Sequence, residues 1–215
     1  QGGSHSIDSF VNLIGYGGNL NNGFTGLIDE VRVYNRVLSA EEVRYHYNRG
    51  GPIAEWKLDE GEGRTVYDSS GNGNNGTLVL AGSATSSAWV AGKYGTALSF
   101  DGVDDYVDAG SAGSSVRTVS FWVKRGDTSD KDIIDLGTPE IKVSSNAITS
   151  AGFTSPAYYI DGVKDTALSA NIWHHVAIVD TVDINASNVD IGRASTNYFN
   201  GLIDEARIYN RALSK

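Results

Sequence analysis

Short stretches of alternating apolar and polar residues run through most of the chain. IAEWKLDE, at residues 53–60, places an apolar side chain at every second position, and TVSFWVK (118–124) and WHHVAIV (173–179) are similar short segments. A period of two is that of a β-strand with one buried face. About a dozen such segments, separated by Gly, Asn and Ser, predict an all-β protein with a β-sandwich or jelly-roll architecture.

One block of sequence occurs twice. FTGLIDEVRVYNRVLS at residues 24–39 and FNGLIDEARIYNRALS at residues 199–214 are identical at 12 of 16 positions and lie 175 residues apart. An offset of one domain length indicates tandem domains rather than a solenoid. We therefore predict that residues 1–50 are the C-terminal part of a preceding domain and that residues 53–214 form a complete second domain.

A short helix is predicted at residues 40–49, after the first block. Ser39 and Glu42 have the spacing of a capping box, in which each side chain accepts the other residue's backbone N–H. Gly50-Gly51-Pro52 supplies a stop signal. A few strands and one helix cannot bury a core alone, so we expect residues 7–50 to dock on the complete domain, on a neighbouring chain or on the rest of their own domain.

Composition narrows the classes of function. The 215 residues include 26 Gly and only 3 Pro, which suits an all-β protein with tight turns. The chain has no cysteine, so disulfides, thiolate metal sites and thiol nucleophiles are excluded. A net charge of −9 argues against a nucleic-acid partner, because phosphate binding needs clustered Lys and Arg. No apolar stretch approaches the ~18 residues of a membrane-spanning helix, so membrane insertion is not expected.

The order of the motifs resembles that of the laminin-G-like domains of the concanavalin A-like lectin/glucanase superfamily. The motifs are DSSGNGNNGTL from Asp68, ALSFDG from Ala97, SFWV from Ser120, WHHVA from Trp173 and the repeated block. The resemblance covers nearly all of residues 53–214 and implies a concanavalin A-like β-sandwich jelly roll. It departs from the family in the middle, where Tyr159–Gly162 precedes Trp173 instead of following it.

The loop Asp68–Gly76 is the predicted metal site. It offers one carboxylate, three asparagines and carbonyls flanked by glycines, and hard oxygen ligands on a flexible loop suit Ca²⁺. The resemblance implies a structural calcium held by this loop together with acids elsewhere. The predicted ligands are Asp68, Asn72, Asn75, Asp101 and Asp204. The alternative is a loop whose polar atoms are satisfied by its own backbone through Asx turns.

Aromatic side chains can stack on the faces of sugar rings. Three of them lie in or near loops and are the predicted ligand-binding residues: Trp89, Tyr158 and Tyr159. Trp56, Trp122 and Trp173 lie in strands with core periodicity, and we assign them to the core.

No catalytic residue is predicted. Asp204 and Glu205 are adjacent on a predicted strand, so they should point to opposite faces and cannot flank one glycosidic bond. Glu205 is expected instead to pair with Arg207 on the same face. His174 and His175 have no nearby nucleophile in the sequence and are expected to be structural.

These features favour a non-catalytic, calcium-stabilised carbohydrate-binding or adhesion module of a tandem-repeat extracellular or cell-surface protein. Its expected partners are a glycan or cell-surface polysaccharide and neighbouring laminin-G-like repeats. Two alternatives stay open: a purely structural spacer in a surface array, and an accessory domain of, or a divergent, glycoside hydrolase or lyase. A pocket lined by Trp89 or Tyr159 would favour the binding module, and a fully covered sheet would favour the spacer.

Overall fold

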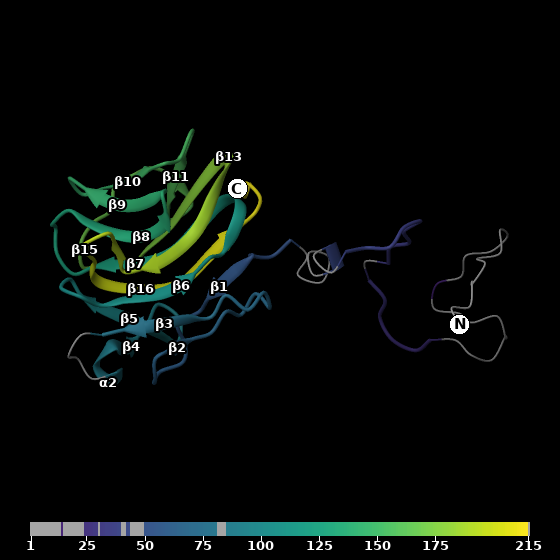
Figure 1. Cartoon of the computed structure of the whole chain (residues 1–215), viewed down its shortest axis with the longest axis horizontal. Helices are drawn as coiled ribbons and strands as arrows, with labels where there is room; N and C mark the ends of the chain where they lie inside the picture. The colour runs from purple at the N-terminus through teal and green to yellow at the C-terminus, as the bar shows by residue number, and fades with distance from the viewer. Residues whose placement is uncertain are drawn as a thin grey trace. The chain divides into compact units, whose positions relative to one another are not determined.

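The computed structural model describes residues 14, 24–29, 31–39, 42–43, 50–80 and 85–214. The chain divides into two units, Gln1–Val43 and Arg44–Lys215, and the second contains all the β-strands that the structure describes (Figure 1). No helix of the described residues is long and apolar enough to cross a membrane.

The larger unit is an antiparallel β-sandwich of two layers. The first layer consists of β12 (Val163–Lys164), β11 (Ala157–Ile160), the first part of β13 (His174–Ile191), β7 (Gly113–Arg125), β16 (Asn200–Tyr209), and then β1 (Ala54–Trp56), β5 (Thr96–Asp101) and β4 (Trp89–Ala91). The second layer consists of β10 (Ala147–Ala151), β9 (Glu140–Ser144), β8 (Lys131–Gly137), the last part of β13, β6 (Tyr106–Gly110), β3 (Gly76–Val79) and β2 (Thr65–Val66). A four-residue helix, α2 (Thr85–Ala88), precedes β4, and β14 (Arg193–Ala194) pairs with β15 (Asn197–Tyr198).

Strand β13 belongs to both layers. Residues 174–179 pair with β7, whereas residues 189–191 pair with β6, and the register shifts between Val179 and Ile184. The long strand therefore bends from one layer into the other, and the two layers form one continuous curled sheet. The predicted all-β class is confirmed, and the curled antiparallel sheet is consistent with the predicted jelly roll.

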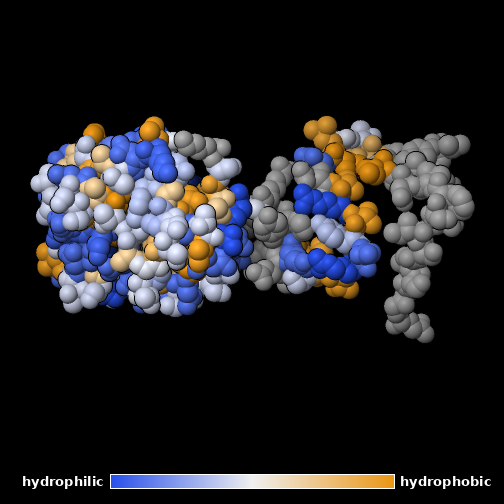
Figure 2. All heavy atoms as spheres, turned by 90° about the horizontal axis from the view of Figure 1, so that it is seen from above, coloured by the Kyte–Doolittle hydropathy of each residue, from blue (hydrophilic) through white to orange (hydrophobic). Residues whose placement is uncertain are grey.

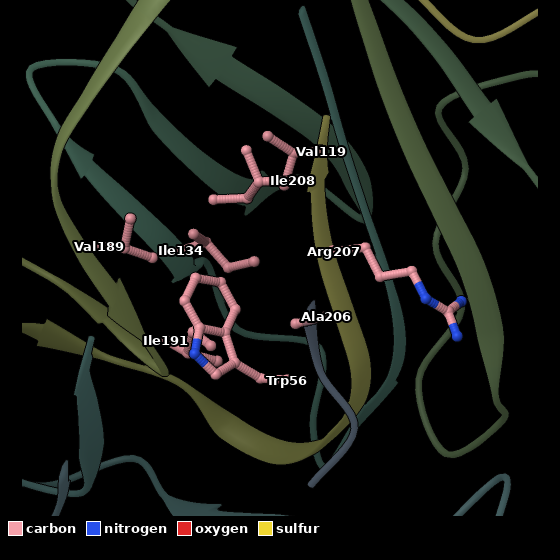
Figure 3. Close-up of a pocket in the computed structure, with 8 residues that line it drawn as sticks. All are labelled: Trp56, Val119, Ile134, Val189, Ile191, Ala206, Arg207 and Ile208. Atoms are coloured by element: carbon pink, nitrogen blue, oxygen red, sulfur yellow. The ribbon is translucent and has the colours of Figure 1, made fainter. Parts of the chain in front are cut away.

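The hydrophobic core lies between the layers. Trp56, Val119 and Ile208 of the first layer face Ile134 and Ile191 of the second (Figure 3). The alternation in residues 53–60 is confirmed, because Ala54, Trp56 and Leu58 are at most 1% exposed. Arg207 precedes Ile208 on β16 and points away from this core, toward the outer side of the first layer.

The smaller unit contains the first copy of the repeated block. Most of its described apolar side chains are exposed, including Leu27 at 100%, Val33 at 79% and Val37 at 92%, whereas Leu38 is half-buried, and Figure 2 shows apolar residues on the surface of this unit. The predicted capping box is present: the Glu42 N–H donates to Ser39 Oγ at 3.1 Å, and the Ser39 N–H donates to Glu42 Oε2 at 2.9 Å. Glu42 and Val43 are helical, and the rest of the predicted helix lies outside the described residues.

The assignment of residues 1–50 to a preceding domain stays a prediction. So does the docking of residues 7–50, much of which lies outside the described residues.

Candidate functional site

The outer side of the first layer carries an aromatic and charged surface centred on Trp122. Phe121 and Val123 are fully buried, so the alternation of β7 directs Trp122 outward together with Ser120 and Lys124. Trp122 pairs with His175 of β13. We call this surface the Trp122 face; its members are Glu55, Tyr94, Ser120, Trp122, Tyr159, His175, Ala177, Glu205, Arg207 and Tyr209.

The indole of Trp122 has aromatic neighbours and remains reachable from solvent. Its ring lies 5.2 Å from the His175 ring and 5.9 Å from the Tyr94 ring, the latter at 79°. The Lys93 Nζ lies over the indole, 4.5 Å from its centroid. Lys93 and Tyr94 are both exposed, so the aromatic group is bordered by surface side chains rather than sealed by the core.

Two small residues lie beside this aromatic group. Ala177 pairs with Tyr159 on one side and with Ser120 on the other, and Ser120 also pairs with Arg207. Paired residues of antiparallel strands share a face. Small side chains therefore separate the Tyr159 ring from the Arg207 guanidinium across the middle of the layer.

Arg207 is held by two carboxylates. Its Nε donates to Glu55 Oε1 at 2.7 Å, and its Nη2 donates to Glu205 Oε2, which confirms the predicted pair of Glu205 and Arg207. Burial by itself lowers the pKa of Arg207, but Glu55 and Glu205 outweigh it and raise the pKa above its ordinary value. Arg207 thus remains a fixed cation with its donors aligned on this face.

His175 lies next to that cation. Burial, and then the charge of Arg207, lower the pKa of His175 below its ordinary value. The imidazole is therefore neutral near pH 7, and a neutral imidazole offers one donor and one acceptor.

A β-bulge changes the geometry expected for Asp204 and Glu205. The register of β16 against β7 shifts between Asp204 and Arg207, and Glu205 has a positive φ of 51°. Asp204 pairs with Trp122, and Glu205 bonds to Arg207, so both acids lie on the side of the Trp122 face. The expectation of opposite faces is wrong, because a bulge inserts an extra residue and interrupts the alternation.

Asp204 is fully buried beneath the loop before β5. The Tyr94 N–H donates to Asp204 Oδ2 at 2.9 Å, and the Thr96 N–H donates to Asp59 Oδ1 at 2.9 Å. Asp204 Oδ1 is buried without a hydrogen-bond partner. Burial raises the pKa of Asp204 to about 6.

Asp204→Asn is expected to stabilise the protein near neutral pH. The folded-state pKa of about 6 lies above the ordinary 3.8, so the folded state binds more protons between these values, and stability falls as pH rises through them. The ionised carboxylate costs about 3 kcal/mol at pH 7. Urea denaturation should show the variant more stable than the parent near pH 7 and similar to it near pH 4. A loss of stability near pH 7 would contradict this prediction.

The Asp68 loop is held together by its own hydrogen bonds. Asp68 Oδ1 accepts the N–H groups of Glu55 and Ser70, and Oδ2 accepts the Ser70 hydroxyl and both the backbone N–H and the side-chain amide of Asn74. Burial raises the pKa of Asp68, but these hydrogen bonds outweigh it, and the net pKa is lowered. The alternative of a self-satisfied loop accounts for this geometry.

The predicted calcium ligands do not assemble. Asn75 Oδ1 accepts the Asp68 N–H, and the Asn72 amide donates to the Ile53 carbonyl. Asp68, Asp101 and Asp204 do not converge on one point: among the described Asp, Glu and His residues, the group of three with ligand atoms within 4.8 Å of one another is Asp101, Asp104 and Asp105.

The predicted sugar-stacking residues are separated in the fold. Trp89 is only 7% exposed, belongs to the core, and its Nε1 donates to the Gly63 carbonyl at 3.1 Å, so its prediction as a ligand residue is corrected. Tyr158 packs against the core, and its hydroxyl lies 2.8 Å from Ser150 Oγ. Tyr159 lies on the Trp122 face. Trp122 itself was assigned to the core, and the burial of Phe121 and Val123 on the opposite face of β7 corrects that assignment.

Comparisons with known proteins bear on the fold. The family model Laminin_G_3, described as the concanavalin A-like lectin/glucanases superfamily, matches residues 2–44. The laminin-G-like resemblance is confirmed. Domain 4 of AbnA, a GH43 extracellular arabinanase from Geobacillus stearothermophilus solved in complex with arabinotriose, matches with a TM-score of 0.54 and 21% identity, over 76% of this chain and 94% of that one. A likeness at this identity shows the fold alone. No curated protein sequence matches the chain.

Proposed function

We propose that residues 53–214 form a non-catalytic carbohydrate-binding module and that the Trp122 face is its binding surface. The observation that carries the proposal is the solvent-reachable Trp122 ring, which lies beside the small residues Ser120 and Ala177 and near the fixed charge of Arg207. A sugar presents an apolar C–H face and a rim of hydroxyls. Recognition therefore needs an aromatic platform next to a few oriented polar groups.

Each member of the face has a role in this proposal. The indole of Trp122 stacks on the sugar ring, and Ser120 and Ala177 leave room for the ring beside it. Arg207, already oriented by its carboxylate partners, donates to hydroxyls with little loss of side-chain entropy. The neutral His175 supplies one further donor and acceptor.

The AbnA domain supports the choice of ligand. That domain shares the fold, was solved with arabinotriose bound and belongs to an extracellular arabinanase. We therefore propose an oligosaccharide as the ligand class, arabino-oligosaccharides as the first to test, and an extracellular location.

The arrangement of the acids supports a non-catalytic role. A glycoside hydrolase uses two carboxyl groups that flank the scissile bond. Here Asp204 has no exposed surface, and the Glu205 carboxylate is bonded to Arg207. Neither group is free to meet a substrate.

Isothermal titration calorimetry with arabinotriose and a panel of other oligosaccharides tests the proposal. Trp122→Ala should weaken binding by about 10-fold to 100-fold, because the loss of a central aromatic contact costs about 1.5–3 kcal/mol. Tyr67→Ala is the matched control, since Tyr67 is an aromatic that is 58% exposed and lies outside the Trp122 face.

Two outcomes count against the proposal. If the folded parent binds no oligosaccharide, the structural spacer is the better reading. If Trp122→Ala binds as tightly as the parent, the site lies elsewhere on the domain.

A further inference from the structure

The turn between β5 and β6 brings three carboxylates together. Asp101 ends β5, and Asp104 and Asp105 immediately precede β6. Their ligand oxygens all lie within 4.8 Å of one another. Asp101 is exposed, whereas Asp105 is only 4% exposed, so the group spans from solvent into the protein.

Among the described residues, the three carboxylates lack counter-charges, and two of their oxygens lack hydrogen-bond donors. Asp104 Oδ1 and Asp105 Oδ1 are both buried, and neither has a hydrogen-bond donor. Within the part of the chain that the structure describes, no Lys, Arg or His nitrogen forms an ion pair with any of the three. The nearby Lys131 Nζ is bonded instead to the Gly102 carbonyl, at 3.4 Å.

The cost of this arrangement is visible at Asp105. Burial, and then the charges of Asp101 and Asp104, raise its pKa above the ordinary value. Like charges held together in a partly desolvated place are unfavourable unless a cation compensates them. The two unpartnered buried oxygens are therefore open to a positive ligand.

We propose that Asp101, Asp104 and Asp105 bind a divalent cation, and that calcium is the ion that fits. All three ligands are hard carboxylate oxygens, with no imidazole or thiolate to favour zinc. Calcium accepts several carboxylates in an irregular geometry, whereas magnesium demands a near-ideal octahedron. The exposed side of Asp101 leaves room for water molecules to complete the coordination.

The site lies where a cation stabilises the fold. A Cβ added at Gly102 would lie 2.9 Å from the Asn200 Cβ, so the turn packs directly on the start of β16. The Asn200 amide in turn donates to Asp127 Oδ2 at 2.9 Å. A bound ion therefore fixes the turn that joins β5 to β6 and packs on the beginning of β16, separately from the Trp122 face.

Calorimetric titration of the EDTA-treated full chain with CaCl₂, together with thermal melts, tests this site. We expect a dissociation constant on the order of 0.1–1 mM, as in other extracellular calcium modules. The melting temperature should rise by about 5 °C at saturating calcium. Asp104→Asn and Asp105→Asn should abolish both the binding heat and the rise.

The melting temperature of the variants in EDTA is a second readout. It distinguishes calcium binding by Asp104 and Asp105 from a purely structural role of these residues. Because each substitution removes part of the charge repulsion, both variants should melt at a higher temperature than the parent in EDTA. Asp108→Asn, on an exposed aspartate of the adjacent strand β6, is the matched control and should keep the calcium response.

The proposal would be overturned if the parent shows no heat of calcium binding. It would also be overturned if calcium still raises the melting temperature of Asp104→Asn and Asp105→Asn. Magnesium binding as tight as calcium binding would overturn the choice of ion.

Discussion

Ile203→Ala is expected to lower the free energy of unfolding by about 4 kcal/mol. Ile203 has no exposed surface and pairs with Leu98 of β5 and Val123 of β7 in the middle of the first layer. Alanine would remove most of the buried side chain and leave a cavity that rigid strands on both sides cannot close. Urea denaturation followed by tryptophan fluorescence measures the loss.

The first repeat supplies a control with the same local sequence. Ile28 occupies the position of Ile203 within an identical GLIDE segment, but it is 47% exposed. Ile28→Ala should change the free energy of unfolding by less than about 0.5 kcal/mol, as for other surface substitutions. If Ile203→Ala and Ile28→Ala lowered the free energy of unfolding equally, the difference in burial between the two isoleucines would be refuted.

Asp68→Ala is expected to cost about 4 kcal/mol as well. The substitution removes an acceptor of five hydrogen bonds. It leaves the backbone N–H groups of Glu55, Ser70 and Asn74 without this acceptor. Each unsatisfied group costs about 1–3 kcal/mol, with partial compensation by water. The loss should be the same in EDTA and in calcium, because these donors, rather than a metal, occupy the carboxylate.

Asp165→Ala is the matched control for this loop. Asp165 is an exposed aspartate that, among the described residues, accepts the neighbouring N–H groups of Thr166 and Ala167, and its loss should cost less than about 1 kcal/mol. A cost of Asp68→Ala that appears only in calcium would restore the metal site predicted for the Asp68 loop.

Much of the architecture could be predicted from the pattern of the chain. The alternation in residues 53–60, and in the second repeated block after its bulge, predicted which side chains share a face, and the burial of Trp56 and Ile208 agrees with it. The capping box of Ser39 and Glu42 was also predictable, because its bonds join residues three apart and need no tertiary partner.

The candidate sites were less predictable. Alternation says that Trp122 and Phe121 lie on opposite faces, but not which of the two faces the second layer. Trp89 was assigned to a loop, yet β4 pairs with β5 and places its ring in the core. The bulge at Glu205 has no marker in the sequence, since its positive φ is held by the pairing of β16 with its neighbours.

The repeated block shows where the sequence stops determining the structure. Phe24 and Phe199 begin nearly identical segments, yet Phe24 is 59% exposed and Phe199 is 1% exposed. The sequence determined the alternation, the turns and the local caps, because these depend on residues a few positions apart. Only the tertiary structure decided which copy is buried and which carboxylates converge. Both depend on neighbours such as β5 and β7, which lie far from the block in the chain.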